Sequence, residues 1–537
     1  MSTSEDVKNR HRNARLLTFN SILVGLVSGL VVSCYRWLIP VIGGAVSEAF
    51  DWGRGSFSSG LIVVLGMLAA GAAASAMVQR EPMIGGSGIP QVAGTMSGHF
   101  KTNWLRVLVY KFFGGLITLG GGLTLGREGP SVQIGASVAD GYCKLTDKSR
   151  SEERYLIAGG AAAGLAAAFN APISGLLFAL EEVHRSFSSL AMVSALSAAL
   201  ASDFVSGLIL GVKPVLDIPQ LPHMRPQIYW LIILLGIIIG LSGVLFNFLI
   251  IKGKRLYAKL PIPKFLKPMI PFLLTALAVL WKPSLFGSGE PFIFLPNGEN
   301  LPVPELLLIY ALKLILLLLA FCSGLPGGIF FPLLILGSLL GNCFGTLCAE
   351  AGLIDPDWVL VFSVIAMSGH FAAIVRSPIT GILLIVEMTG SFSYLLPLGL
   401  VALVSYFTAE VCRSEPVYES LLDIILENQQ KRYTHRVTAL RQAERYSREA
   451  EHISAKPAGR PDLMVEFSID PGSEAAGKKI REIDWPDNVL WISVKRGAQE
   501  ILPKGHVELL AGDYLVGLLC HEDLPELEEK MHTILGD

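Results

Sequence analysis

The sequence has few charged residues. Only 16% of its 537 residues are Asp, Glu, Lys or Arg, whereas soluble domains usually carry about 25%. A soluble chain of this length would fold as several domains and would need more polar surface than these residues supply. Apolar residues make up 52% of the chain, and the mean hydropathy is +0.53. The composition therefore excludes a soluble enzyme and a disordered chain, and it predicts an integral membrane protein.

Cysteine is also scarce, and its distribution suggests no site. The seven cysteines include no C-x-x-C pair and no Cys/His pattern with zinc spacing. Most of them lie in apolar runs, where a free cysteine behaves as a small hydrophobic residue. No Ser/His/Asp set or phosphate-binding loop stands out. We therefore expect no metal, no cofactor, no nucleic-acid partner and no enzymatic activity.

Apolar segments follow one another from residue 16 to residue 411. Several of them reach the ~20 residues that a membrane-spanning helix needs. Others are cut by Gly and Pro at 86–90, 126–130 and 326–332, in a chain that contains 55 Gly and 30 Pro. The first apolar run lacks the small-residue cleavage site of a secretory signal peptide, so we expect it to be retained as a membrane helix. The sequence thus predicts a polytopic, all-α membrane domain with broken helices.

Composition divides the chain into four parts. We expect an N-terminal segment over 1–15, a transmembrane domain over 16–427, a basic linker over 428–460 and a small domain over 461–537. The stretch 431–460 has eight Lys or Arg against three Glu, which suits contact with anionic headgroups or a simple solvated linker. The last part has seven Lys or Arg against sixteen Asp or Glu. Basic residues before the first apolar run predict a cytoplasmic N-terminus, and we expect the C-terminus in the cytoplasm as well.

The acidic C-terminal part has the pattern of a small α+β domain. Alternating or apolar runs predict strands at Leu463–Ile469, Val489–Val494 and Tyr514–Leu519. The segment Ser473–Ile483 is interpreted as a helix with a serine N-cap. Apolar residues at helical spacing predict a second helix over Glu526–Ile534.

The membrane domain contains an internal repeat. Pro172–Glu181 aligns without gaps on Pro378–Glu387. A weaker pair aligns Gly126, Pro130 and Gly135 with Gly328, Pro332 and Gly337. Chance similarity of apolar runs is the alternative, and the shared Pro, Gly and Glu argue against it. We expect two related halves, about 16–212 and 225–427, and structural roles for Glu181 and Glu387, which both halves keep.

Three Gly- and Pro-rich clusters interrupt the apolar segments. They are Gly85-Gly86-Ser87-Gly88-Ile89-Pro90, Gly126-Arg127-Glu128-Gly129-Pro130 and the run from Gly324 through Gly328, Ile329, Phe330 and Phe331 to Pro332. Close packing of small residues explains any single cluster equally well. Three clusters in two repeated halves instead indicate broken helices that end at a transport site. Helix N-termini expose unpaired N–H groups and partial positive charge, so the expected ligand is an anion.

These motifs resemble the signature of the CLC family of chloride channels and chloride/proton antiporters, over about residues 16–427. The resemblance implies an inverted repeat of broken, tilted helices in a plasma-membrane homodimer with one pore per subunit. It implies that Ser87, Ile329, Phe330 and Tyr418 bind the central chloride. The surrounding motif positions are Gly86, Gly88, Pro90, Gly126, Arg127, Gly129, Pro130, Gly328 and Pro332.

Two glutamates within the apolar segments, Glu128 and Glu182, indicate which kind of transport to expect. Glu128 matches the family's gating glutamate, whose carboxylate competes with chloride, and Glu182 matches the inner proton-transfer glutamate of its antiporters. Intramembrane carboxylates are costly and usually functional. The resemblance thus favours chloride/proton exchange, with a passive voltage- or ligand-gated chloride channel as the alternative. A serine at position 87 favours chloride over nitrate, whereas Phe331 stands where the family often has Ala.

Residues 461–537 resemble a different family, the RCK-C or TrkA-C domains of potassium-transport regulators. Some of these domains dimerise and bind a small regulator, in several bacteria cyclic di-AMP. The resemblance suggests that Arg496, Ile501, Lys504 and His506 form a pocket for an anionic nucleotide. A dimerising domain without any ligand explains the same residues equally well.

Overall fold

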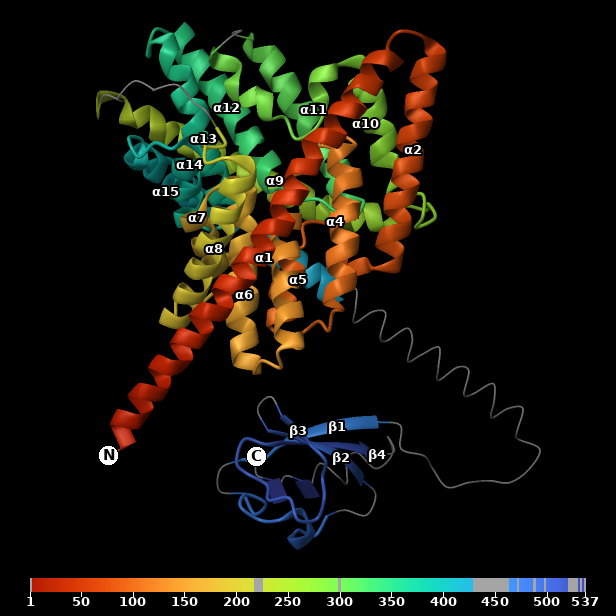
Figure 1. Cartoon of the computed structure of the whole chain (residues 1–537), viewed down its shortest axis with the longest axis vertical. Helices are drawn as coiled ribbons and strands as arrows, with labels where there is room; N and C mark the ends of the chain where they lie inside the picture. The colour runs from red at the N-terminus through yellow and green to blue at the C-terminus, as the bar shows by residue number, and fades with distance from the viewer. Residues whose placement is uncertain are drawn as a thin grey trace, which may run out of the picture. The chain divides into compact units, whose positions relative to one another are not determined.

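The structure is a computed structural model with two compact units, Met1–Gln430 and Lys431–Asp537. It describes residues 2–216, 226–297, 301–427, 463–470, 473–485, 489–496, 499–519, 530–531 and 534–535. The expected basic linker over 428–460 lies outside the described residues. Figure 1 shows a large helical membrane unit and a small unit that contains the strands.

The described residues of the first half of the membrane unit form ten helical elements. They are α1 (Ser2–Gly53), α2 (Phe57–Arg80), η1 (Pro82–Ile84), α3 (Ile89–Met96), α4 (Trp104–Gly120), α5 (Glu128–Leu145), α6 (Arg150–Phe169), α7 (Pro172–Phe178), η2 (Ala179–Val183) and α8 (Ser189–Leu210). The expected breaks are present, because the chain is not helical at residues 85–88 or 121–127.

The second half repeats this series. Its described elements are η3 (Pro226–Ile228), α9 (Tyr229–Lys259), α10 (Met269–Trp281), η4 (Pro283–Leu285), η5 (Glu290–Asn297), α11 (Val303–Cys322), α12 (Phe330–Glu350), η6 (Pro356–Trp358), α13 (Val359–Val375), α14 (Pro378–Thr389) and α15 (Leu395–Val411). A last helix starts at Val417 and is described as far as residue 427. The loop 324–329 supplies the third expected break.

The two halves have opposite orientations. The series α5 to α8 corresponds to α12 to α15, and α7 and α14 both begin with proline, whose fixed φ suits a first helical turn. In Figure 1, α5 and α6 lie toward the end where α1 starts, whereas α12 and α13 lie toward the opposite end. This arrangement confirms the repeat and the predicted fold class.

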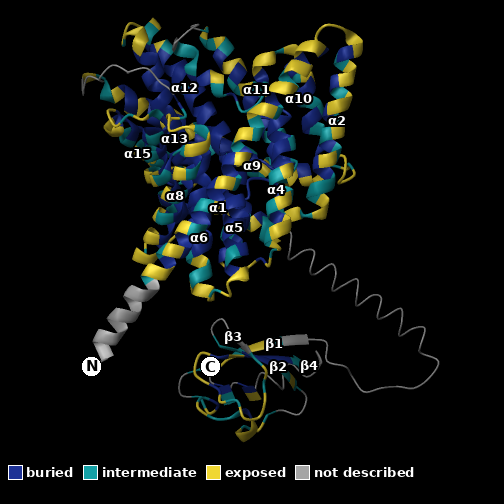
Figure 2. Ribbon diagram, in the orientation of Figure 1, coloured by how far each residue is buried: buried dark blue, intermediate teal, exposed yellow. Residues whose placement is uncertain are grey.

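Within the described residues, seven helical stretches are long and apolar enough to cross a membrane. They differ in burial: Pro356–Val375 is 100% buried across its most apolar window, whereas Phe57–Arg80 is 28% buried. Figure 2 shows the buried residues gathered in the middle of the helical unit and exposed residues on α2. The outer helices thus present apolar side chains to lipid, while inner helices such as α13 form a core.

Each half caps a helix of the other half. The Glu181 carboxylate accepts hydrogen bonds from the Thr380 backbone amide (2.9 Å) and hydroxyl (2.6 Å) at the start of α14. The Glu387 carboxylate accepts from the backbone amides of Ile173 (3.0 Å) and Ser174 (2.7 Å) at the start of α7, and from the Ser174 hydroxyl. These contacts satisfy amides that have no partner within the helix and put negative charge at positive helix ends.

The small unit contains one antiparallel sheet with strand order β1-β4-β2-β3. Its strands are β1 (Leu463–Ser468), β2 (Val489–Arg496), β3 (Gln499–Ile501) and β4 (Tyr514–Leu519). Three of them match the predicted strands, and β3 was not expected. The expected helix over Glu526–Ile534 falls mostly on residues that are not described.

The predicted helix over Ser473–Ile483 is wrong. Apart from a short 3₁₀ turn, η7 (Ile480–Glu482), this segment is not helical. Gly477 has a φ of +83°, and its amide donates to the Leu509 carbonyl at 2.7 Å. The Ile480 amide likewise donates to the Val507 carbonyl at 2.9 Å. The backbone therefore makes only short local turns and otherwise pairs with residues 505–509, so it does not continue as a helix.

Removing either reciprocal cap is expected to destabilise the membrane unit. Glu181→Ala and Glu387→Ala each leave buried or half-buried donors without an acceptor, so each should cost roughly 1–2 kcal/mol and lower the Tm in detergent. The matched control is Glu350→Ala, which removes an exposed carboxylate at the end of α12. Equal Tm values for the three variants would contradict the capping role.

Candidate functional site

The two halves meet through backbone hydrogen bonds between their broken segments. Gly126 and Gly328 exchange a pair of hydrogen bonds, each with an N···O distance of 2.7 Å. The Gly86 amide donates to the Leu325 carbonyl at 3.0 Å, and the Gly327 amide donates to the Gly86 carbonyl at 3.1 Å. Irregular backbone persists at membrane depth only where such groups are satisfied or line a cavity. All three predicted clusters are thus joined.

The junction leaves no room for side chains. A Cβ on Gly129 would lie 2.7 Å from the Ser87 carbonyl oxygen, 2.9 Å from its hydroxyl and 3.2 Å from Gly328 Cα. A Cβ on Gly328 would lie 3.1 Å from the Gly129 nitrogen and 3.2 Å from the Gly126 oxygen. Glycine is required here because the three loops approach at backbone distance.

Four helices begin around this junction. Gly88, Arg127 and Ile329 are the N-cap residues of α3, α5 and α12, and Tyr418 lies in the first turn of the helix that starts at Val417. The first amides of a helix have no intrahelical partner and carry partial positive charge. Together these helix N-termini form a site of partial positive charge.

The predicted chloride ligands are buried there. The exposed fractions are 2% for Ser87 and Tyr418 and 0% for Ile329 and Phe330. The Tyr418 hydroxyl lies beside Ser87, with Glu128 and Glu182 close enough to act on it electrostatically, and it makes no hydrogen bond of regular geometry with a described residue. A buried hydroxyl without a partner is costly unless a ligand or water completes it. The structure thus brings these predicted residues to one place.

Glu128 is the first residue of α5 and is 1% exposed. Its Oε2 has no hydrogen-bond partner in the described chain, and its Oε1 lies 3.9 Å from Arg127 Nε. A Cβ on Gly126 would come within 2.4 Å of Oε2 and 2.9 Å of Pro332 Cδ. The carboxylate is therefore seated against the crossing of the two halves, at a helix N-terminus that favours negative charge.

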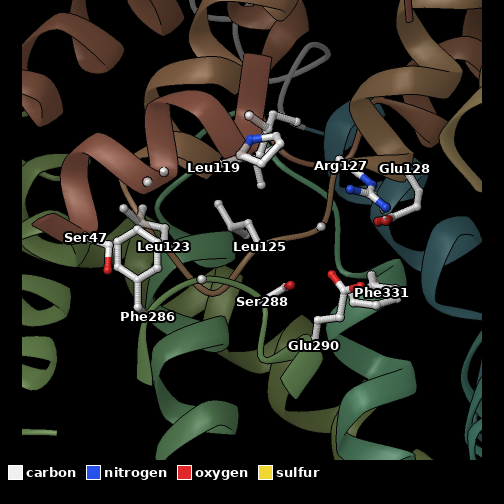
Figure 3. Close-up of a pocket in the computed structure, with 16 residues that line it drawn as sticks. Ser47, Leu119, Leu123, Leu125, Arg127, Glu128, Phe286, Ser288, Glu290 and Phe331 are labelled. Carbon is white, nitrogen blue, oxygen red and sulfur yellow. Dashed lines mark ion pairs between the residues drawn. The ribbon is translucent and has the colours of Figure 1, made fainter. Parts of the chain in front are cut away.

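A hollow of about 390 Å³ reaches this carboxylate. Residues 39–47 near the far end of α1 line it, together with the end of α4, the 286–290 loop and Phe331. Figure 3 shows Arg127, Glu128, Phe331, Ser288 and Glu290 around the hollow. Phe331, which stands where the resembled family often has Ala, thus forms part of its wall.

Glu182 lies on the opposite side of the junction, near the first turns of α6, because the neighbouring His184 ring packs against Tyr155 at 5.7 Å. Tyr155 is linked through Ser194 to Ser21 of α1, whereas the hollow at Glu128 is lined by the other end of α1.

Glu182 belongs to the π-helical turn η2, and such turns are frequent at functional sites. The carboxylate is buried, with Oε1 3.4 Å from Arg185 Nη2 and Oε2 accepting from the Ser377 hydroxyl at 3.4 Å. Arg185 also pairs with Glu419 at 2.9 Å. The side chains of Glu419 and Arg185 thus form a charged path from the surface to Glu182.

Sequence reasoning missed two buried lysines that hold loops of the site. Lys111 Nζ donates to the carbonyls of Ile84 (2.8 Å) and Gly86 (2.7 Å). Lys313 Nζ donates to the carbonyls of Leu285 (2.9 Å) and Gly287 (2.8 Å). Their positions in equivalent helices of the two halves, 202 residues apart, were the available signal. Each ammonium satisfies carbonyls that a broken helix leaves unpaired.

The structure places the predicted regulator residues on β2, on β3 and in the loop that follows β3. Arg496 binds Asp513 through two hydrogen bonds of 2.8 and 2.7 Å and also donates to the Glu508 carbonyl. Ile501 ends β3, while Lys504 and His506 are exposed in the following loop. The Arg496 guanidinium is thus already paired, and binding of a nucleotide by these residues stays a prediction.

The arrangement can bind an anion and handle a proton at the same place. Helix N-termini and the hydroxyls of Ser87 and Tyr418 provide donors for an anion. The Glu128 carboxylate can occupy the same donors when ionised and leave them when protonated. Glu182 supplies a second buried carboxyl on the other side of the junction.

Two family models match the chain. One, described as voltage gated chloride channel, covers residues 70–410, and the other, the TrkA-C domain, covers residues 464–531. Among curated relatives, the H⁺/Cl⁻ exchange transporter ClcA of Vibrio cholerae serotype O1 is 36% identical over 431 residues, which are 76% of this chain and 90% of that protein. The ClcA of Cronobacter sakazakii is 37% identical over 368 residues, 66% of this chain and 78% of that protein.

Solved structures share the fold. A slow cyanobacterial Cl⁻/H⁺ antiporter superposes with a TM-score of 0.73 and 28% identity, covering 77% of this chain and 99% of that one. A eukaryotic CLC transporter has a TM-score of 0.64 and 23% identity over 76% of this chain and 74% of that one. The second likeness is evidence for the fold alone.

The Arg496–Asp513 pair predicts a pH dependence of the small unit. Burial raises the pKa of Asp513, but hydrogen bonds from Arg496 and the Leu510 amide outweigh it, so the net pKa lies below the ordinary value. Such a carboxylate stabilises the fold above its unfolded pKa of about 3.9, and this contribution is lost as the pH falls through its lower folded pKa.

We expect Asp513→Asn to destabilise the sheet by roughly 1–2 kcal/mol at neutral pH. Hydrogen exchange of residues 489–519 in the intact protein should rise in this variant at pH 7, and less so at acidic pH. The control Glu474→Gln removes an exposed pair with Lys478. Unchanged exchange at pH 7 would show that the Asp513 pair does not stabilise the sheet.

Proposed function

The chain belongs to the voltage-gated chloride channel, or CLC, family and carries a C-terminal TrkA-C domain, and we propose that it exchanges chloride for protons across a cell membrane. The observation that carries this proposal is a pair of buried carboxyls, Glu128 and Glu182, on opposite sides of the junction where the broken helices begin. Passive conduction of chloride needs no second buried carboxyl. The names of the ClcA relatives and of the cyanobacterial neighbour support the same activity.

Chloride is proposed to bind where the broken helices begin. The Ser87 and Tyr418 hydroxyls and the backbone amides of Ile329 and Phe330 are the expected donors. Phe330 is fixed by Phe371, Phe169 and Phe178, with ring centroids 4.7, 5.6 and 5.7 Å away. This packing supports the amide positions. An anion bound by dipoles instead of full charges is stabilised yet able to leave, as transport requires.

Proton and chloride movement are proposed to be coupled through competition. An ionised Glu128 is an anion at a helix N-terminus and resists chloride entry. A protonated Glu128 is neutral and gives up that position. Glu182 would receive or supply the proton on the opposite side, where Arg185 and Glu419 connect it with the surface.

We propose a cytoplasmic location for both termini and a homodimeric assembly. The basic residues before the first apolar run support the orientation. The CLC resemblance supports the dimer, and apolar side chains exposed on α8 and α15, such as Phe204 and Phe407, are available for it. Light scattering in detergent tests the assembly, and a monomeric mass would contradict it.

Glu128→Gln is expected to abolish proton movement and leave chloride flux. The neutral amide cannot carry a proton and no longer competes as an anion. The measurement uses proteoliposomes with a chloride gradient, a chloride electrode and a pH electrode. The unmodified protein should move protons in the direction opposite to chloride.

Glu182→Val separates exchange from conduction. The substitution removes the carboxyl that is proposed to carry the proton on the side of the junction opposite Glu128. Proton coupling should therefore be lost while chloride still moves. Glu350→Gln, at an exposed position, serves as the control. If the unmodified protein moves chloride without protons, the exchange proposal is wrong and a passive channel takes its place.

We also propose that the TrkA-C domain regulates transport, with cyclic di-AMP as the ligand to test. Its exposed Lys504 and His506 support an anionic ligand, whereas the paired Arg496 weakens that support. Calorimetry of the intact protein with cyclic di-AMP should give saturable heat, reduced by Lys504→Ala. Absence of heat at saturating concentrations would reject this ligand.

A further inference from the structure

The second half contains its own version of the Ser87 loop. Gly287-Ser288-Gly289-Glu290-Pro291 has the same Gly-Ser-Gly-x-Pro pattern as Gly86-Ser87-Gly88-Ile89-Pro90, 201 residues earlier. The structure confirms the correspondence, because a buried lysine binds two carbonyls of each loop: Lys111 in the first half and Lys313 in the second. The two loops are therefore equivalent parts of the inverted repeat.

The two loops differ at the residue after the second glycine. The first loop has Ile89, which is 1% exposed. The second has Glu290, which is half-buried and lines the hollow beside Glu128. Within the described chain, the Glu290 carboxylate makes no hydrogen bond or ion pair. The carboxylate is therefore open to water in the hollow.

The hollow connects the two carboxyls. Glu290 and Glu128 line the same space of about 390 Å³, with Ser288 and Arg127 also in its wall. Figure 3 shows them around one cavity. A water molecule occupies about 30 Å³ in the liquid, so the hollow has room for a chain of several waters. The buried Glu128 Oε2, which has no partner among the described residues, is available at its inner end.

Glu128 and Glu290 are the two acids in the described wall of the hollow, and of these Glu290 is the one without an ion pair. Arg127 lies near Glu128, and Lys313 is committed to the carbonyls beneath the loop. Arg36 on α1 binds the Ala167 carbonyl and Asn170. The titratable and charged groups near Glu290 are thus Arg36, Arg127, Glu128 and Lys313.

We propose that Glu290 is a proton relay between Glu128 and the solution at the mouth of the hollow that both residues line. This role rests on the proposed exchange of chloride for protons. Protonated Glu290 gives its proton to a water of the hollow, and a water next to Glu128 gives a proton to that carboxylate. Glu290 is then reprotonated from hydronium or buffer in solution. Only O–H bonds form and break, and the sequence reverses when protons leave.

Glu290→Gln in proteoliposomes tests the relay, with equal pH on both sides so that protein orientation does not matter. We expect the exchange rate to fall several-fold near pH 8, where hydronium is scarce, and to approach the unmodified rate near pH 5. The number of chlorides moved per proton should stay unchanged. High concentrations of imidazole, a small proton carrier, should restore the rate at pH 8.

A double variant distinguishes relay from simple charge repulsion. With Glu128→Gln in place, chloride moves without protons, so adding Glu290→Gln should leave chloride flux unchanged. A changed flux in that background would show that Glu290 acts on chloride entry and would overturn the relay. Glu48→Gln, which removes a carboxylate of α1 that does not line the hollow, controls for net charge.

The outcomes separate the two proposals. If Glu290→Gln matches the unmodified protein at every pH while both move protons, the relay is wrong and exchange stands. A pH-independent deficit that imidazole does not restore also overturns the relay, since a structural defect would behave in this way. If the unmodified protein moves no protons, both proposals fail.

Discussion

The backbone pairing of Gly126 with Gly328 is the contact on which the site depends. Chain interrupted within a membrane must satisfy its amides and carbonyls inside the protein. Here each half does so with backbone of the other half, which brings the N-termini of α5 and α12 together. The glycines are dictated by this closeness, and the positive helix ends follow from it. The place where the repeats meet is therefore also the place where an anion is favoured.

Much of the fold was predictable because it is encoded in local patterns. Apolar length identified the membrane helices, and the match of Pro172–Glu181 with Pro378–Glu387 identified the halves. The structural role expected for Glu181 and Glu387 is confirmed by their caps. In the tail, Ser473–Ile483 was mistaken for a helix because its backbone pairs with residues distant in sequence, and local periodicity does not report such pairing.

The site was predictable in its residues and not in its surroundings. Glycine clusters and the family motif located Ser87, Glu128 and Ile329, yet the support of Lys111 and Lys313 required three-dimensional contacts. Ser288 and Glu290 were missed because the second Gly-Ser-Gly loop lies outside the stretches that align most strongly. Its neighbours in the hollow come from α1, α4 and α12, and no sequence spacing shows that these elements converge.

The reciprocal caps also bear on the order of synthesis. Glu387 lies 214 residues after Ile173, and the Ile173 amide donates a hydrogen bond to the Glu387 carboxylate. At about 5–20 residues per second, the start of α7 waits roughly 10–40 s after its own synthesis for its acceptor to emerge. During that interval the first half has an incomplete helix end within the bilayer. The two halves therefore reach their final form together, and a ribosome that stalls between them would leave a product suited to recognition by quality control.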